Sequence, residues 1–153
     1  MHYVHESEIA APPQAVFAFH ERPEALALLV PPWEKVVVVQ PPSSLAPGTR
    51  VLLKMKLGPL SVTWEAEHTL YEKNVLFQDR MVRGPFAKWV HTHRFLPSAG
   101  GTLLRDEVEL ALPFGPLGLL GWPLARRRLE KMFAYRHAKT REAVLASLPD
   151  KRA

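Results

Sequence analysis

The chain has 153 residues, of which 47% are apolar and 23% are charged, and its net charge at pH 7 is +5. These proportions indicate a single globular domain and exclude a disordered chain. The sequence contains no cysteine, which excludes disulfides, a cysteine nucleophile and thiolate metal sites.

Two further features bear on location and partners. No stretch approaches the ~20 consecutive apolar residues of a membrane span, and the first residues do not begin a secretory signal. We therefore expect a cytoplasmic protein. The basic charge leaves a membrane surface, RNA or an acidic ligand open as partners.

The first part of the chain predicts one strand followed by two short helices. Tyr3–Ala10 has the composition of a strand. Prolines then introduce the short helices Gln14–His20 and Pro23–Leu29, and Pro31 ends the second. Helices this short are not stable alone, so we expect them to pack on the rest of the domain.

Six more strands are predicted next, without a helix between them. Their apolar residues alternate with polar ones, and their connections are short, which is typical of an antiparallel meander with one covered face. The predicted strands are Lys35–Gln40, Arg50–Leu57, Leu60–Tyr71, Val75–Met81, Phe86–Leu96 and Thr102–Leu112.

A long terminal helix is predicted over Pro123–Leu148, where neither glycine nor a further proline interrupts the chain before Pro149. Apolar residues recur at helical spacing along one face, and His137 lies on that same face. This helix is the only predicted element long enough to cover the sheet. We expect one domain over residues 1–149 and a tail at 150–153.

Several local motifs accompany this order of elements. They are Ile9–Pro12 before Val16–Phe17, Asp79 ahead of Gly84–Phe86, Trp89-x-His91-x-His93-x-Phe95, Gly100–Thr102, Asp106, Leu112–Gly115 and Met132–Arg136. Together they resemble the helix-grip proteins of the SRPBCC superfamily, which includes START lipid-transfer domains and birch-pollen-allergen proteins. The resemblance is nearest to bacterial cyclase/dehydrase-like or coenzyme-Q-binding-like members.

The resemblance implies an α+β fold in which a curved antiparallel sheet of about seven strands wraps the C-terminal helix, with two short helices after the first strand. It also implies a cavity for an apolar small molecule between sheet and helix. It does not imply a cofactor, and we expect none.

The alternation of the strands and the face of the helix define a candidate ligand-binding set. Apolar walls with a few converging polar groups are typical of small-molecule pockets. A filled core, or a hydrogen-bond network that satisfies itself, would use the same positions. The set is Trp64, His68, Phe77, Asp79, Met81, Trp89, His91, His93, Phe95, Asp106, Phe133 and His137. We expect Trp64, Trp89, Phe95 and Phe133 to line one shared space.

The polar members of this set allow two kinds of chemistry. His91 and His93 point the same way from one strand, so they could chelate a metal with a third ligand from His68, Asp79 or Asp106. This spacing has low specificity and the resembled family does not generally use a metal, so we expect none to be bound. An Asp–His pair could instead act as a general acid and base, but no residue is assigned as catalytic.

A glycine-punctuated apolar stretch, Phe114–Leu124, precedes three arginines. We interpret it as a mobile lid that faces an anionic membrane; the alternative is a buried lead-in to the helix. The residues assigned to it are Leu117, Leu119, Leu120, Trp122, Arg126, Arg127 and Arg128, and Trp122 is expected to be at least partly accessible. Outward glutamates on the strands argue against nucleic acid as a partner.

The sequence therefore predicts a carrier or sensor for a hydrophobic small molecule or lipid-like ligand. One alternative is a cyclase/dehydratase-type enzyme that acts on a polyketide-like substrate. A second alternative is a protein or RNA interaction module with a closed core.

Overall fold

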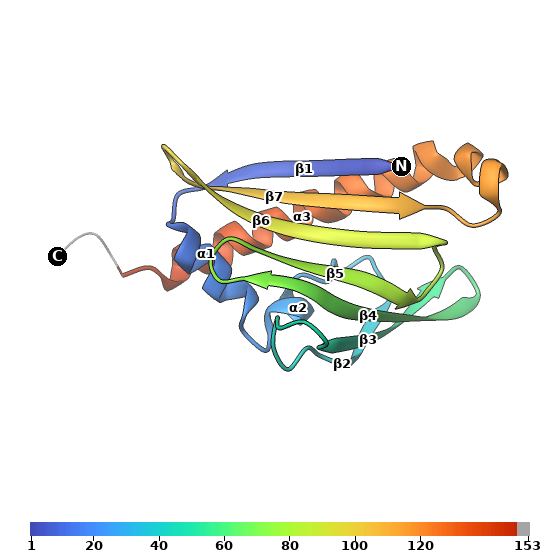
Figure 1. The fold of residues 1–153 in the computed structure, drawn as a ribbon, viewed down its shortest axis with the longest axis horizontal. Coiled ribbons are helices and arrows are strands. Elements are labelled where there is room, and N and C mark those ends of the chain that lie inside the picture. Colours follow the sequence, from blue (N-terminus) through green and yellow to red (C-terminus); the bar gives the residue numbers. More distant parts are fainter. Residues whose placement is uncertain (150–153) are drawn as a thin grey trace.

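The computed structural model describes residues 1–149, so the tail predicted at 150–153 lies outside the described residues. Its elements follow the predicted order (Figure 1). They are β1 (His2–Ile9), α1 (Pro13–His20), α2 (Ala25–Leu28), β2 (Val36–Gln40), β3 (Arg50–Leu57), β4 (Leu60–Glu72), β5 (Leu76–Arg83), β6 (Lys88–Ser98), β7 (Gly101–Ala111), the 3₁₀ helix η1 (Gly115–Gly121) and α3 (Trp122–Ser147). The second short helix is a single turn, shorter than expected.

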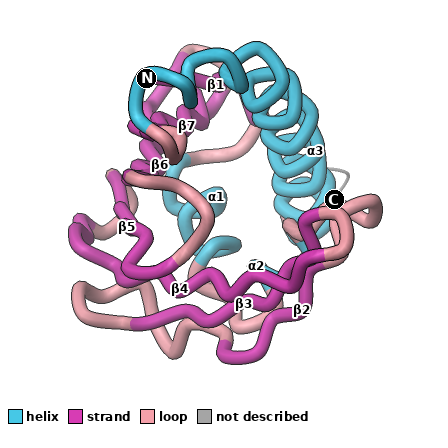
Figure 2. The backbone as a smooth tube through the Cα atoms, turned by 90° about the vertical axis from the view of Figure 1, so that its right-hand side faces the viewer, coloured by secondary structure: helices cyan, strands magenta, loops and turns pink. Residues whose placement is uncertain are grey.

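The seven strands form one antiparallel sheet in the order β1-β7-β6-β5-β4-β3-β2. Because β1 pairs with β7, the first and last strands lie side by side, while β2 forms the opposite edge. Figures 1 and 2 show α3 running along one side of the curved sheet, with α1 and α2 near one end. This is the predicted helix-grip architecture. Within residues 1–149, no helix is both long enough and apolar enough to cross a bilayer.

Two apolar clusters make up the core. One surrounds α1 and includes Phe17, Phe77, Phe95, Leu104 and Val144. The other lies between β1, β6, β7 and α3 and includes Tyr3, Trp89, Val108, Leu129 and Phe133. Four inward polar residues lie along the chain between a residue of one cluster and a residue of the other. They are His91 and His93 on β6, Asp106 on β7 and His137 on α3. This polar group therefore lies in the middle of the covered face of the sheet.

The close packing of β7 against the end of β1 requires a glycine at position 101. Gly101 has φ +131°, and a Cβ there would lie 2.5 Å from the carbonyl oxygen of Ile9. The next residue, Thr102, donates its hydroxyl to the carbonyl of Ala11 at 2.7 Å. These contacts fix the turn that leads from β1 into α1.

The prediction of which side chains face inward is wrong around the turn between β4 and β5. Leu70 and Val75 are exposed, although their alternation placed them with the buried residues. The pairing of β4 with β5 shifts register between His68 and Leu70, so the alternation changes at that point. Val75 lies in the turn before β5 begins.

Candidate functional site

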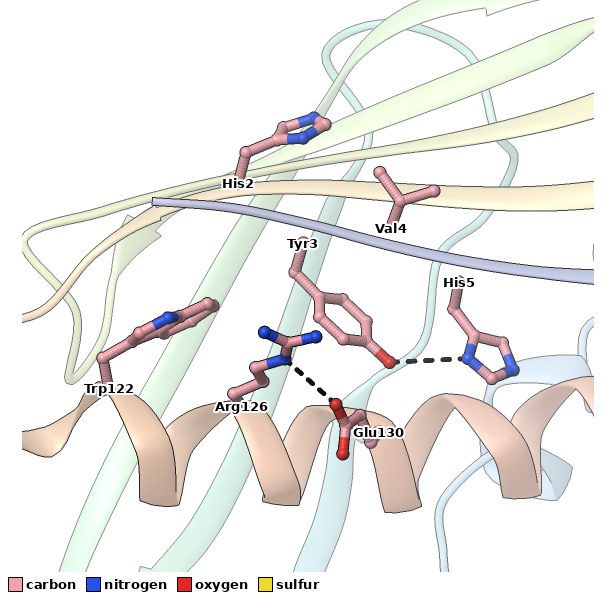
Figure 3. A pocket seen from close by; sticks show the side chains of 7 residues that line it. All are labelled: His2, Tyr3, Val4, His5, Trp122, Arg126 and Glu130. Atoms are coloured by element: carbon pink, nitrogen blue, oxygen red, sulfur yellow. Dashed lines mark hydrogen bonds and ion pairs between the residues drawn. The ribbon is translucent and has the colours of Figure 1, made fainter.

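A small outer pocket of about 340 Å³ lies between β1 and the start of α3 (Figure 3). Its residues are His2, Tyr3, Val4, His5, Trp122, Arg126 and Glu130. The charged pair in it is already satisfied, since Arg126 donates to Glu130 at 3.0 Å. Burial, aided by Glu130, raises the pKa of Tyr3 to about 12, so its hydroxyl stays protonated at neutral pH.

A larger cavity of about 630 Å³ lies between the covered face of the sheet and α3. Its wall is mostly apolar and is formed by the end of α1 at His20, α2, strands β2 to β7, η1 and α3, together with the loops that connect them. Pockets of about 300–1,000 Å³ hold small organic ligands. Nine of the twelve predicted residues line it, namely Trp64, His68, Phe77, Asp79, Trp89, His91, His93, Asp106 and His137.

Three predicted residues are not part of this wall. Phe95 and Phe133 lie in the packed core, and Met81 is partly buried against it. Phe95 packs against Phe17, with ring centroids 5.0 Å apart. Phe133 stacks on Tyr3 at 5.6 Å. The prediction that Trp64, Trp89, Phe95 and Phe133 line one shared space is therefore wrong for the two phenylalanines. Phe95 is covered by α1, and Phe133 is covered by β1.

Asp106 is the centre of the polar group and is only 3% exposed. Nε2 of His137 donates to its Oδ2 at 2.8 Å, and Nδ1 of His137 accepts the hydroxyl of Ser7 at 2.7 Å. The other carboxylate oxygen lies 2.7 Å from Nδ1 of His93 and 3.2 Å from Nε2 of His91. These last two are close electrostatic contacts and not well-aligned hydrogen bonds. The chain Ser7–His137–Asp106 ties α3 to β1 and β7.

Burial and the contacts between the residues together set the charge states of Asp106 and His93. Burial alone would raise the pKa of Asp106, but the contacts with His93, His137 and His91 hold that pKa well below its usual range. Burial, with a smaller effect of His91, lowers the pKa of His93. At neutral pH the arrangement is therefore a charged carboxylate beside a neutral His93.

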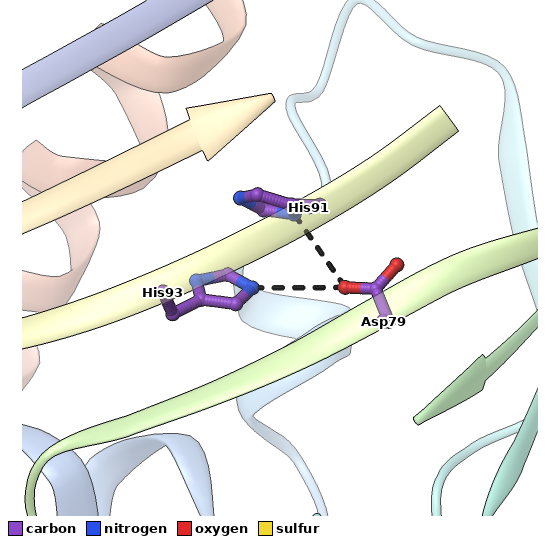
Figure 4. A group of neighbouring side chains, drawn as sticks. All are labelled: Asp79, His91 and His93. Atoms are coloured by element: carbon purple, nitrogen blue, oxygen red, sulfur yellow. Dashed lines mark ion pairs between the residues drawn. The ribbon is translucent and has the colours of Figure 1, made fainter. Parts of the chain in front are cut away.

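A second carboxylate, that of the partly buried Asp79 on β5, faces the two histidines of β6 (Figure 4). Its Oδ2 lies 3.6 Å from Nδ1 of His91 and 3.9 Å from Nε2 of His93. Burial raises the pKa of Asp79, and the nearby His93 and His68 offset only part of this effect. Two acids in one site thus have pKa values shifted in opposite directions.

Sequence reasoning missed three charged residues of the wall, namely Arg22, Glu34 and Arg136. Nε of Arg136, on α3, is buried and has no hydrogen-bond partner among the described residues. Burial lowers the pKa of the guanidinium, which lies 5.7 Å from the ring centroid of Phe133. The signal was present, because Met132, Arg136 and Thr140 recur every four residues and all three line the cavity.

The glycine-punctuated stretch is largely exposed, and no residue of η1 is buried. Phe114 and Leu120 are each 82% exposed, and Leu117, Leu119 and Leu124 are also exposed. The alternative of a buried lead-in is therefore wrong. Leu117 and Arg128 line the cavity as well, so the cavity reaches the surface beside η1.

The remaining residues assigned to this stretch lie outside the cavity wall. Leu119, Leu120 and Arg127 belong to neither pocket, whereas Trp122 and Arg126 belong to the outer one. Trp122 is partly exposed. The accessibility expected of Trp122 is thus present, and contact with a membrane stays a prediction.

A family model described as polyketide cyclase / dehydrase and lipid transport matches residues 9–134. A comparison with curated proteins finds no match. Among solved structures, the chain is similar to a protein of Thermus thermophilus, with 22% identity, a TM-score of 0.76, and 97% of this chain and 100% of that chain covered.

Two solved enzymes are also similar. The Zhui aromatase/cyclase of Streptomyces sp. R1128 has 20% identity and a TM-score of 0.63 over 95% of this chain and 92% of its own. Norcoclaurine synthase of Thalictrum flavum, in complex with dopamine and hydroxybenzaldehyde, has 18% identity and a TM-score of 0.70 over 98% of this chain and 89% of its own. Likenesses at this level of identity establish the shared fold.

Proposed function

The chain belongs to the polyketide cyclase / dehydrase and lipid transport family, and we propose that it binds a hydrophobic small molecule or lipid-like ligand as a carrier or sensor. The observation that carries the proposal is the cavity of about 630 Å³ with its mostly apolar wall. A cavity of this size argues against the alternative of an interaction module, which requires a closed core.

The wall suggests how such a ligand would lie. Its apolar body would pack on Trp64, Trp89 and their apolar neighbours, and its polar end would face Arg136 and the histidines. A buried donor without an acceptor is costly, so a ligand oxygen that accepts from Nε of Arg136 would remove that cost. We therefore propose a ligand with one polar end, of carbonyl, hydroxyl or carboxylate type.

Filling the cavity should abolish uptake without unfolding the protein. Ala66 is buried on β4, lines the cavity and stands between Trp64 and His68 on the same face. We expect Ala66→Phe to weaken binding of a fluorescent apolar probe by about tenfold or more, because an overpacked site typically costs about 1–3 kcal/mol and 1.4 kcal/mol is tenfold. Fluorescence titration and native mass spectrometry of bound ligand measure this effect.

The matched control is Thr63→Phe on the same strand, at a position outside the cavity wall. It adds the same ring and should leave probe binding unchanged. Equal affinity of the parent protein and Ala66→Phe would place the binding site elsewhere.

Catalysis of the cyclase/dehydratase type is the second candidate, because Asp106, Asp79 and the histidines line the same cavity. Two acids with oppositely shifted pKa values are a typical arrangement for a general acid and base. Turnover of a polyketide-like substrate, lost in Asp79→Asn, would distinguish an enzyme from a carrier.

We also propose that the stretch from Phe114 to Leu124 docks on an anionic membrane where ligand enters. Five exposed apolar side chains lie in this stretch, and Arg127 and Arg128 follow them as exposed cations. Exposed apolar patches mark contact surfaces, and each arginine near an anionic bilayer contributes about 1 kcal/mol.

Replacing Arg126, Arg127 and Arg128 by glutamine should reduce binding to phosphatidylserine vesicles by about a hundredfold at low salt, since about 1 kcal/mol is lost per arginine and 1.4 kcal/mol is tenfold. Sedimentation with vesicles measures this, and added salt should weaken the parent in the same way. The control removes the same charge from Lys54, Lys56 and Arg83, which are exposed elsewhere. Equal loss in both triple variants would show that only net charge matters and contradict a docking surface.

Nucleic acid remains an unfavoured partner, because the outer face of the sheet carries paired charges. Glu65 pairs with Arg50, Glu67 with Arg80, and Glu107 with Arg94 and Arg105. A phosphate backbone needs an unpaired basic surface.

A cytoplasmic location also stays a prediction.

A further inference from the structure

Three potential ligand atoms converge at the polar wall of the cavity. Nδ1 of His91, Nε2 of His93 and a carboxylate oxygen of Asp79 all lie within 4.8 Å of one another (Figure 4). They come from adjacent strands, since Asp79 on β5 pairs directly with His91 on β6. Each residue also lines the cavity. Rigid strands, rather than a loop, therefore position all three groups.

Asp106 faces the opposite side of both imidazole rings. Its Oδ1 lies 3.2 Å from Nε2 of His91 and 2.7 Å from Nδ1 of His93. A carboxylate at this place favours a hydrogen on each of those two nitrogens, which leaves a lone pair on the nitrogens that face Asp79. Metal-binding histidines typically have their other ring nitrogen oriented by a carboxylate in this way.

We propose that Asp79, His91 and His93 bind a divalent transition-metal ion, with Zn²⁺ the best match to two imidazoles and one carboxylate. With metal–ligand bonds of about 2.0–2.1 Å, the ligand atoms of a tetrahedral site lie about 3.3 Å apart. The carboxylate oxygen of Asp79 lies 3.6 and 3.9 Å from the two imidazole nitrogens, which themselves lie within 4.8 Å of each other, so side-chain shifts of about an ångström bring the three ligand atoms to this value. Imidazole ligands disfavour Mg²⁺ and Ca²⁺.

This inference reverses the expectation from the sequence, where the pair His91 and His93 alone had low specificity. Among the third ligands open from the sequence, the structure selects Asp79, and it adds Asp106 as an orienting carboxylate. Three protein ligands leave at least one position of the ion open, as in catalytic zinc sites. That position faces the cavity, where the ion would hold an oxygen of a ligand or a water. Binding of the ion itself does not depend on which organic ligand the cavity accepts.

The test is metal uptake by full-length protein after treatment with a chelator. We expect titration with Zn²⁺ to give one ion per chain by elemental analysis after gel filtration. Co²⁺ should give the intense visible absorption of a low-coordinate site. Loss of a carboxylate that orients a metal ligand typically weakens metal binding by about 10–100-fold, and we expect this effect for Asp106→Asn. Asp79→Asn and His93→Gln each remove a ligand and should weaken Zn²⁺ binding by more than this factor.

His68→Gln is the matched control, because His68 is buried on the same wall but is not one of the three ligands. It should bind Zn²⁺ like the parent. Ala66→Phe should also retain the ion while losing the apolar probe, so failure of the metal site and failure of the ligand cavity are distinguishable. The proposal is overturned if the parent protein takes up no stoichiometric Zn²⁺ or Co²⁺, and this result does not depend on whether the variants fold. It is also overturned if His68→Gln weakens Zn²⁺ binding as much as Asp79→Asn and His93→Gln do.

Discussion

Replacing Asp106 with alanine should lower the free energy of unfolding by about 3 kcal/mol. The substitution removes the acceptor of the His137 hydrogen bond and leaves the rings of His91 and His93 without their charged neighbour. Each buried donor that loses its acceptor costs about 1–3 kcal/mol, and these losses are not fully additive. Urea unfolding at pH 7 with a chelator present measures the effect without a contribution from bound metal.

Glu107→Ala provides the comparison on the same strand. Glu107 points outward and pairs with Arg94 and Arg105, both of which are partly exposed. Exposed pairs of this kind contribute about 0–1 kcal/mol, so this variant should be far milder. Asp106→Asn should lie between the two, since it keeps the shape and one acceptor. If Asp106→Ala is no more destabilising than Glu107→Ala, the buried network does not hold α3 to the sheet.

The fold was predictable because alternation and helical spacing each report a burial pattern directly. Trp89, His91, His93 and Phe95 share one face of β6, and the structure places them there. The failure at Leu70 has a physical cause. A bulge between His68 and Leu70 changes which side chains face inward, and no residue type in that stretch signals it.

The site was less predictable, because alternation gives the face of a residue but not its depth along the cavity. Phe95 and Trp89 have the same parity on β6, yet only Trp89 reaches the cavity. Where α1 and β1 cover the face depends on tertiary packing. Arg136 was missed because its charge suggested the solvent-facing side of α3. Its spacing of four residues from Met132 places it on the covered side.

For the stretch around η1, the sequence allowed both an exposed lid and a buried lead-in to the helix. Its leucines are compatible with burial or with solvent, and the difference depends on whether any element packs over them. In the structure Gly118 lies tightly against Pro113, where a Cβ would come 2.5 Å from the carbonyl oxygen. Leu119 and Leu120 are exposed, and Leu117 is exposed but also lines the cavity.

Acid should destabilise the protein in part through His20, the last residue of α1. Its ring is buried among Phe19, Phe77 and Phe95, and its Nδ1–H donates to the carbonyl of Val16 at 2.9 Å. Burial lowers the pKa of His20 from 6.5 to about 3. The titratable groups that act on it are His93 and His137, which lower the pKa, and Asp106, which raises it.

The sign follows from the proton count in the two states. Between pH 6.5 and about 3 the unfolded chain protonates His20 and the folded chain does not, so stability falls as the pH falls through this range. The loss begins below the unfolded pKa and is complete near the folded one. At pH 5 it amounts to about 2 kcal/mol, since each pH unit in the window contributes about 1.4 kcal/mol.

His20→Phe should therefore flatten the dependence of unfolding free energy on pH by about 2 kcal/mol between pH 7 and pH 5. The ring is retained for packing and the titration is removed, so the difference between the two pH values isolates the proton effect from the lost Val16 bond. Burial also lowers the pKa values of His5, His68 and His93, and these contribute to the slope that remains. His2→Gln, at an exposed position, should leave the slope of the parent unchanged. Urea unfolding at both pH values makes the measurement, and a slope in His20→Phe equal to that of the parent would show that His20 is not the buried neutral group.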